Sequence, residues 1–467
     1  MVNVPELGSA RSDEWLAAST DWKDLGTGIG GVADQVDSEV TGIIAHGAWT
    51  GSAATAAHLR MQAVVTAMEA AHGEINAVSD VLEGLGQAII ICQRALEEAQ
   101  QMASQHGLTI GADGTVSGHH GNVVERLAED IIGWVDGKQA SPAQIAEIQD
   151  LVTQTLRRAT QADEEAAQEL RKIASHAGLT DPQQTYGVNQ YPNADGLAAS
   201  RLELEMIYQS IPTAPPSVVS QWWANLSSEQ KATLMEAAPG KIGTIDGIPD
   251  IVKTQLIGSD GINRVALVNY ALNNTLNGAG DVPGEDNCTN FTSDALQAAG
   301  LREMGNLTSE KVLHTDSNVD NNWYKEPPQW PLGAGSTRSH SWGGAGDLHE
   351  FLTHNGSKEV AYSQALPGDV AFFKDPKEGI YHAAVITAKV NGQVFYSQHT
   401  PGEQNADWGS RQTMPGITDP NNPSSIIIVR PGQDHSPVPT PQAGATPTPP
   451  ASPVPQARPN PQPNQRP

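Results

Sequence analysis

The sequence is poor in cysteine, in positive charge and in long apolar runs, and each shortage excludes a class of protein. Two cysteines in 467 residues do not make a disulfide framework. Lys and Arg total 27 against 53 Asp and Glu, a formal net charge of −26, so the chain lacks the basic face that a nucleic-acid binder needs to neutralise phosphates. No apolar run reaches the length of a membrane span, so we expect no transmembrane segment.

The two ends of the chain are also informative. The stretch from Met1 to Glu6 has neither a basic region nor an apolar core, so we expect no ordinary cleaved signal peptide. From His435 onward the chain consists mostly of Pro, Thr, Ala, Gln and Ser, which cannot bury enough surface to fold. We predict a disordered Pro-rich tail behind two or three folded domains.

The N-terminal part has the pattern of two long helices. Apolar residues recur at helical spacing from about Ser12 to Ile44, and a second such pattern runs to about Ser104. Between them stands Trp49-Thr50-Gly51, where glycine lets the chain reverse and we expect Trp49 to pack onto the helices. This hairpin resembles the WxG-type substrates of the type VII secretion systems of actinobacteria. The resemblance implies export without a cleaved signal peptide, and the secretion machinery or a helical protein as partner; a plain dimerisation hairpin is the alternative.

The region after the hairpin carries weaker signals. Gly111 to Gly114 predicts a turn between two very short strands, and helical patterns cover 123–135 and 142–174. Tyr191 to Asp195 fits the Tyr-x-x-x-Asp pattern of type VII export signals, a pattern common by chance. His119-His120 has no carboxylate or thiol at ligand spacing, so we expect no metal site there and no cofactor elsewhere.

Cys288 is the candidate nucleophile. It lies in the polar stretch from Asp286 to Ser293, at the first turn of a helix that we expect to run to about Ala299 and to end at Gly300. The unpaired N–H groups and the dipole of a helix start favour a thiolate over a thiol. The other cysteine, Cys92, is mid-helix among apolar residues and is interpreted as a buried small hydrophobe.

A base for this nucleophile follows on a predicted hairpin. His382 lies on a strand from Tyr381 to Thr387, and the Asn391-Gly392 turn leads into a second strand from Gln393 to His399. Cysteine at a helix start, histidine on a strand and a polar residue on the next strand is the order found in papain-like cysteine hydrolases.

The third catalytic residue is either Gln398 or His399. Side chains alternate along a strand, so only one of these two neighbours can face His382. We choose His399, because a neutral histidine that accepts from the His382 ring N–H would fix its tautomer.

The second half of the sequence resembles the Putative amidase domain family of bacteria, a group of papain-like cysteine hydrolases. The resemblance covers roughly residues 263–408 and is carried by five motifs: Asn263-Arg264-Val265-Ala266 with Tyr270-Ala271, Asp286 to Phe291, Asn322-Trp323 with Ser341-Trp342, Pro367-Gly368-Asp369-Val370, and Tyr381-His382 with Tyr396 to Thr400. It implies hydrolysis of amide bonds, with peptidoglycan as substrate and with Asn287 and Asp286 at the oxyanion or substrate pocket. The family usually has aspartate directly before the cysteine, whereas here Asn287 takes that place and Asp286 lies one residue earlier.

Together these features predict an α+β multidomain protein. We expect a helical hairpin at 1–105, a helical extension at 106–182, a linker with Trp222-Trp223 at 183–255, a papain-like amidase domain at 256–433 and the tail at 434–467. The expected function is a secreted or cell-wall-associated cysteine amidase or peptidase with Cys288, His382 and His399 as catalytic residues. The alternatives are a toxin delivered by type VII secretion and a non-catalytic cell-surface binding protein.

Overall fold

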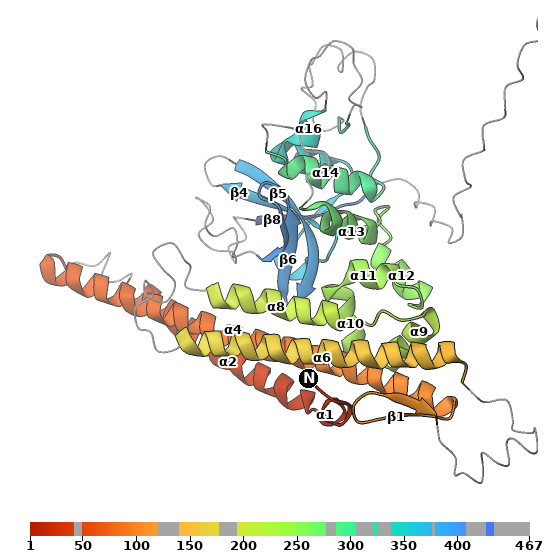
Figure 1. Cartoon of the computed structure of the whole chain (residues 1–467). Coiled ribbons are helices and arrows are strands. Elements are labelled where there is room, and N and C mark those ends of the chain that lie inside the picture. Colours follow the sequence, from red (N-terminus) through yellow and green to blue (C-terminus); the bar gives the residue numbers. More distant parts are fainter. Residues whose placement is uncertain are drawn as a thin grey trace, which may run out of the picture.

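A computed structural model describes residues 1–41, 49–118, 140–176, 194–276, 286–304, 322–325, 338–375, 379–407 and 426–433. Long helices make up the N-terminal part, and a six-stranded sheet with helices makes up the C-terminal part (Figure 1). The predicted α+β class is therefore confirmed, whereas a papain-like fold stays a prediction.

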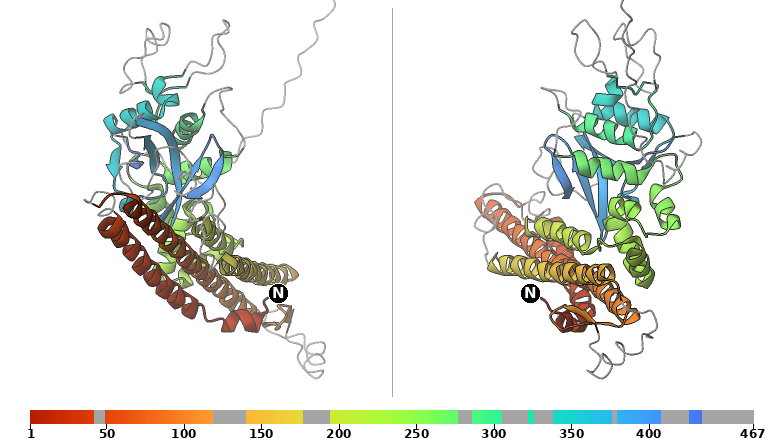
Figure 2. Two further views of the ribbon diagram at one scale, coloured as in Figure 1. Left: turned by 90° about the vertical axis from the view of Figure 1, so that its left-hand side faces the viewer. Right: turned by 45° about the vertical axis from the view of Figure 1, so that its right-hand side comes forward.

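Two long antiparallel helices form the N-terminal part, as predicted. The short helix α1 precedes α2, α2 continues into a π-helical turn, and α4 returns along it: α1 (Val4–Ser9), α2 (Ser12–Val36), π-turn (Asp37–Thr41), α4 (Ser52–Gln105). Both turned views show α2 and α4 side by side (Figure 2). Ser19 Oγ lies 3.2 Å from Ser79 Oγ across the contact. The residues that α2 buries are all small and recur every seven positions, namely Ser12, Ser19, Gly26 and Ala33, which lets the two backbones approach closely.

The turn between these helices differs from the expectation. Trp49 is 52% exposed, so the prediction that it packs onto the helices is wrong. Gly51 has φ +102, a conformation that favours glycine, directly before α4 begins. Residues 42–48 lie outside the described residues, and a WxG-type hairpin therefore stays a prediction.

Helix α4 is long and apolar enough to cross a membrane by length and composition alone. However, 61% of its apolar window is buried inside the structure. Its neighbours there are α2, α6 (Pro142–His176) and α8 (Ala194–Ser210). Its apolar face is therefore a packing surface for three other helices.

The predicted short hairpin and the helix after it are confirmed. Strands β1 (Leu108–Ile110) and β2 (Val116–Gly118) pair antiparallel, and Gly114 in the turn between them has φ +84. Helix α6 spans the second predicted helical pattern. The helix expected at 123–135, the pair His119-His120, and Tyr191 lie outside the described residues.

Four shorter helices connect the long helices to the sheet: α9 (Pro216–Asn225), α10 (Ser228–Ala237), α11 (Pro239–Thr244) and α12 (Asp250–Ile257). Trp222 of α9 is fully buried in the same hydrophobic core as the apolar residues of α4, α6 and α8. This segment is therefore packed into the helical part.

The sheet is antiparallel throughout, with strand order β3-β8-β4-β5-β6-β7. Its strands are β3 (Lys358–Val360), β4 (Val370–Asp375), β5 (Gly379–Val390), β6 (Gln393–Gln398), β7 (Glu403–Asp407) and β8 (Ile426–Arg430). Asn391 and Gly392 both have positive φ, 50° and 84°, as a two-residue turn between β5 and β6 requires. The predicted hairpin is confirmed.

Helices cover one face of this sheet: α13 (Arg264–Asn274), α14 (Cys288–Ala298) and α17 (Ala345–His354), with the short α16 (His340–Gly343) packed against α14 and α17. Phe291 of α14 and Phe351 of α17 share a core cluster with Phe372 and Val385 of the sheet. Alternate strand residues form a second cluster on the other face, with Phe373, Ala384, Ile386 and Tyr396 among them.

The end of the β5–β6 hairpin packs against the helical part. Ala388, Val390 and Phe395 belong to the same core cluster as the long helices. Asn391 Nδ2, at the turn, donates to Glu203 Oε1 of α8 at 2.6 Å. The two parts therefore share a core at this point, and the predicted domain boundaries stay predictions.

Candidate active site

Cys288 is the first residue of α14, as the sequence predicted. The helix follows Asn287, its first backbone bond joins Phe291 N to Asn287 O at 3.0 Å, and Gly300 with φ 96° follows its end. The thiol is nearly buried, at 5% exposure, and its Sγ lies 3.6 Å from Thr289 Oγ1. A helix start presents N–H groups without intrahelical partners, so the thiol lies where negative charge is stabilised.

Buried polar contacts fix α14 in place. Ser293 Oγ donates to the Trp342 carbonyl at 3.0 Å and accepts from Trp323 Nε1 at 3.1 Å. The two indole rings stack with centroids 4.5 Å apart. Asp294 of the same helix pairs with Lys325 at 2.7 Å. The motifs Asn322-Trp323 and Ser341-Trp342 therefore support the helix that carries Cys288.

The two residues before Cys288 differ in burial: Asn287 is buried and Asp286 is exposed. Asn287 is buried, its backbone N–H donates to Thr400 Oγ1 at 3.0 Å, and its Oδ1 accepts from Asn290 Nδ2 at 2.9 Å. Asp286 is exposed. The Asn287 backbone N–H is thus engaged by Thr400, and roles for Asn287 and Asp286 toward an oxyanion or substrate stay predictions.

His382 lies on β5, opposite Phe373 of β4. It is 4% exposed, and its ring meets the Phe373 ring edge-on at 5.4 Å. Its Nε2 lies 2.8 Å from Gln398 Oε1. An amide oxygen only accepts, so Nε2 carries the proton in this contact.

The structure gives the contact with His382 to Gln398, and the expected facing of His399 is wrong. Val385 pairs with Ser397 and Ile386 pairs with Tyr396, which sets the register of the hairpin. Paired residues share a face and alternate positions follow them, so Gln398 lies on the face of His382. Strand alternation alone could not reveal this, because it does not say which residues are paired.

His399 contacts the helix of the candidate nucleophile. Its ring lies 5.8 Å from that of Phe291, one turn after Cys288, with an interplanar angle of 34°. Thr400, the next residue, binds the Asn287 backbone. The end of β6 thus meets His382 through Gln398 and the start of α14 through the two residues that follow. Whether His399 acts in catalysis stays a prediction.

Glu403 is a residue that sequence reasoning missed. Its Oε2 accepts from Gln398 Nε2 at 2.7 Å, and it pairs with Gln398 across β6 and β7. No motif points to it, because the contact depends on a register shift between these two strands.

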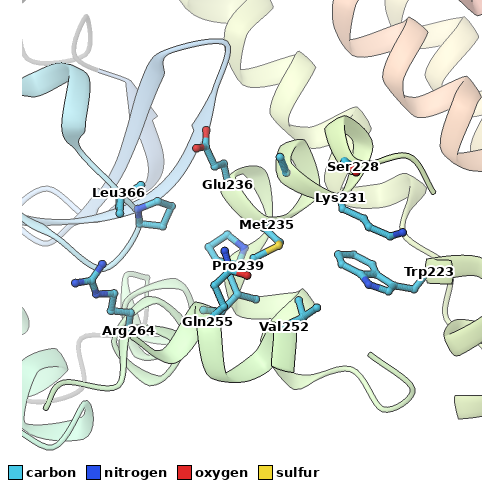
Figure 3. Close-up of a pocket in the computed structure, with 13 residues that line it drawn as sticks. Trp223, Ser228, Lys231, Met235, Glu236, Pro239, Val252, Gln255, Arg264 and Leu366 are labelled. Atoms are coloured by element: carbon cyan, nitrogen blue, oxygen red, sulfur yellow. The ribbon is translucent and has the colours of Figure 1, made fainter. Parts of the chain in front are cut away.

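Two cavities occur away from these residues. One, of about 460 Å³, lies between α9, α10, α12 and the segment before β4, with Trp223, Met235, Arg264 and Pro367 in its lining (Figure 3). Another, of about 510 Å³, lies between α8, α13 and β7. Neither is lined by Cys288 or by the two histidines. Among the described residues, no cluster of three His, Cys, Asp or Glu side chains could hold a metal ion.

The comparisons with known proteins bear on this region alone. No curated protein and no solved structure matches the chain. The model of the family described as Putative amidase domain matches residues 262–418, which include Cys288, His382, Gln398, His399 and Glu403. The C-terminal part of the chain is therefore similar to an amidase domain, and this similarity indicates a hydrolase that acts on amide bonds.

Proposed function

We propose that the protein is a cysteine-dependent amidohydrolase in which Cys288 is the nucleophile and His382 is the base. The observation that carries the proposal is the end of β6, where Gln398 contacts the buried His382 and Thr400 binds the backbone of Asn287, the residue before the helix-start Cys288. The amidase-domain similarity supports the reaction class, and the geometry supports the choice of residues. A cysteine with only a structural role would not need a place at a helix start.

The reaction follows from the protonation of the ring. Because Nε2 of His382 donates to Gln398, the basic nitrogen of the neutral ring is Nδ1, which takes the thiol proton. The thiolate attacks the amide carbonyl, and the backbone N–H of Cys288 helps to stabilise the oxyanion. The His382 imidazolium then protonates the leaving amine, and water hydrolyses the acyl-enzyme with His382 again as base.

The substrate that we propose is an amide bond of peptidoglycan, either in the peptide stem or at its link to the sugar. The family resemblance carries this choice; the net charge of −26 does not, because it offers no attraction to anionic wall polymers. The test is to incubate the full-length protein with purified peptidoglycan and to identify the fragments by mass spectrometry. New amine termini should form with the wild type and not with Cys288→Ala.

The full-length protein is the right material because the hairpin that carries His382 and Gln398 is packed into the helical part. Turnover by Cys288→Ala equal to that of the wild type would refute the cysteine mechanism. If iodoacetamide labels Cys288 of the wild type but the protein releases no peptidoglycan fragment, the result would favour the alternative that the protein is a non-catalytic cell-surface binding protein. Comparing walls of the producer and of a competitor would separate wall remodelling from toxin delivery.

We also propose that the N-terminal helices bind a helical partner protein during type VII export, after which the protein is associated with the cell wall or secreted. Along α2, large apolar side chains face outward beside the stripe of small buried residues: Trp22 is 38% exposed, Leu25 49%, Val32 48% and, in the following π-turn, Val40 39%. The spacing of three and seven residues in α2 puts them on one helix face, as a partner helix would require.

Charge favours a partner over a second copy of this chain. Asp21 and Asp24 lie beside Trp22 and Leu25, with Lys23 between them, and the chain carries a net charge of −26. A basic amphipathic helix is therefore complementary, and an acidic copy is repelled. Export is tested by deleting the type VII machinery of the host, which should leave the protein inside the cell. Unaltered export would mean that the hairpin is a dimerisation device. Leu25→Asp and Val32→Asp should weaken partner binding, whereas the exposed Thr27→Asp on another face should not.

A further inference from the structure

Three side chains from neighbouring strands form a continuous chain of hydrogen bonds. His382 of β5 meets Gln398 of β6 at 2.8 Å, and Gln398 meets Glu403 of β7 at 2.7 Å. Gln398 is 1% exposed, so its amide cannot exchange these partners for bulk water. The outer end of this series of hydrogen bonds is the carboxylate of Glu403, which is only partly buried.

The chemistry of these groups decides which one donates and which one accepts in each of the two hydrogen bonds. An ionised carboxylate accepts hydrogen bonds and cannot donate, so the Gln398 group that faces Glu403 must be the NH₂. The amide oxygen then faces His382 and can only accept. The ring nitrogen at that contact must therefore carry the proton, which places the lone pair on Nδ1.

We propose that Glu403 is a positioning residue that sets the tautomer of His382 through the Gln398 amide. The catalytic consequence rests on the proposed function, because the Nδ1 lone pair matters only if His382 is the base for Cys288. Glu403 itself touches neither the thiol nor the substrate position. A glutamine amide alone has no such preference, because it can rotate by half a turn and present its NH₂ to the ring instead.

The backbone around Glu403 is held against α13 by the residues before and after it in the chain. A side chain at Gly402 would collide with the carbonyl of Thr275 at the end of α13, so the turn before Glu403 is packed against that helix. After Glu403, Gln404 Nε2 donates to the Leu272 carbonyl of the same helix at 3.0 Å. A fixed backbone holds the carboxylate within reach of the amide, as a positioning role requires.

The experiment uses full-length protein with ¹⁵N-labelled histidine. The ring ¹⁵N shifts of His382, assigned by their loss in His382→Gln, report which nitrogen is protonated. We expect the wild type to be protonated at Nε2. In Glu403→Gln the new amide can donate to Gln398, which lets Gln398 rotate, and the spectrum should show a substantial Nδ1–H population. The kcat on peptidoglycan should fall on the order of 10²-fold with little change in KM.

A double variant separates tautomer control from simple structural support. In Gln398→Glu with Glu403→Gln, the carboxylate accepts from His382 directly and from the amide at 403, so the Nε2–H form and much of the kcat should return. Glu350→Gln removes an exposed carboxylate of α17 in the same part of the chain and should change neither readout.

An unchanged tautomer in Glu403→Gln, or Nδ1–H in the wild type, would overturn the proposal. Loss of activity without rescue in the double variant would overturn the catalytic consequence. The spectrum reports the tautomer whether or not the protein cleaves peptidoglycan, so a failed activity assay refutes the proposed function and leaves the tautomer test intact.

Discussion

Asn391, at the tip of the hairpin that carries His382, donates a 2.6 Å hydrogen bond to Glu203, a carboxyl group buried in the helical part. Asp80 of α4 lies in the same buried region and accepts from Ser200 Oγ at 2.6 Å. The contact between the β5–β6 hairpin and the helical part, which we call the joint, therefore includes the acidic side chains of Glu203 and Asp80.

We predict that acid stabilises this joint and that neutral pH weakens it. Burial, together with the charges of Asp80 and Glu83, raises the pKa of Glu203 well above its usual value, and Lys23 opposes this. Burial also raises the pKa of Asp80 to about 6, against the hydrogen bond from Ser200 and the charge of Lys23.

A raised folded-state pKa means that the stabilising contribution is complete below the unfolded pKa of about 4 and is lost as pH rises through the folded value. The melting temperature should therefore fall between pH 4 and pH 7, and the fall should be shallower in Asp80→Asn. Parallel curves for the variant and the wild type would contradict the prediction, and Asp21→Asn on the exposed face of α2 is the control.

Asn391→Ala should destabilise the protein by about 1–3 kcal/mol, because it removes the donor to a buried carboxyl group. Denaturant unfolding measures this loss. The neighbouring turn residue, Gly392, must keep its positive φ and cannot serve as the control. The control change is therefore made at the exposed Lys358 of β3, where Lys358→Ala should cost little. An equal cost in the two variants would mean that the hairpin tip is not specifically held.

The two cysteines should differ widely in reactivity toward iodoacetamide. Burial raises the pKa of Cys92 to about 12, so its thiolate fraction at neutral pH is on the order of 10⁻⁵. Cys288, at a helix start, should be labelled far faster in the folded protein, as mass spectrometry of the peptides can show. Slow and equal labelling of both would remove Cys288 as nucleophile.

Gln398→Ala should reduce kcat more than His399→Ala. Gln398 contacts the His382 ring at 2.8 Å, whereas His399 packs on Phe291 of α14. Loss of a base-orienting group costs up to roughly 10⁴-fold in comparable triads. Steady-state kinetics on peptidoglycan fragments rank the two variants, and the opposite ranking would return His399 to the role first expected of it.

Much of the local structure followed from the sequence. The helix that begins at Cys288 and the turn at Asn391-Gly392 were predicted because glycine positions and apolar spacing act over a few residues. The long helices α2 and α4 followed from periodicity for the same reason. The exposure of Trp49 did not, because it depends on what packs around the turn.

The sequence by itself thus determined the elements and the residue types at the site, a cysteine at a helix start and a histidine on a strand. Tertiary structure alone decided that Gln398 rather than His399 meets His382, that Glu403 lies behind Gln398, and that strand residues beside the hairpin turn join the core of the long helices. The physical reason is the separation along the sequence of the residues whose contacts set each feature. Helix caps and turns are set by neighbouring residues, whereas strand register and the packing of one part against another are set by contacts between residues far apart in the chain.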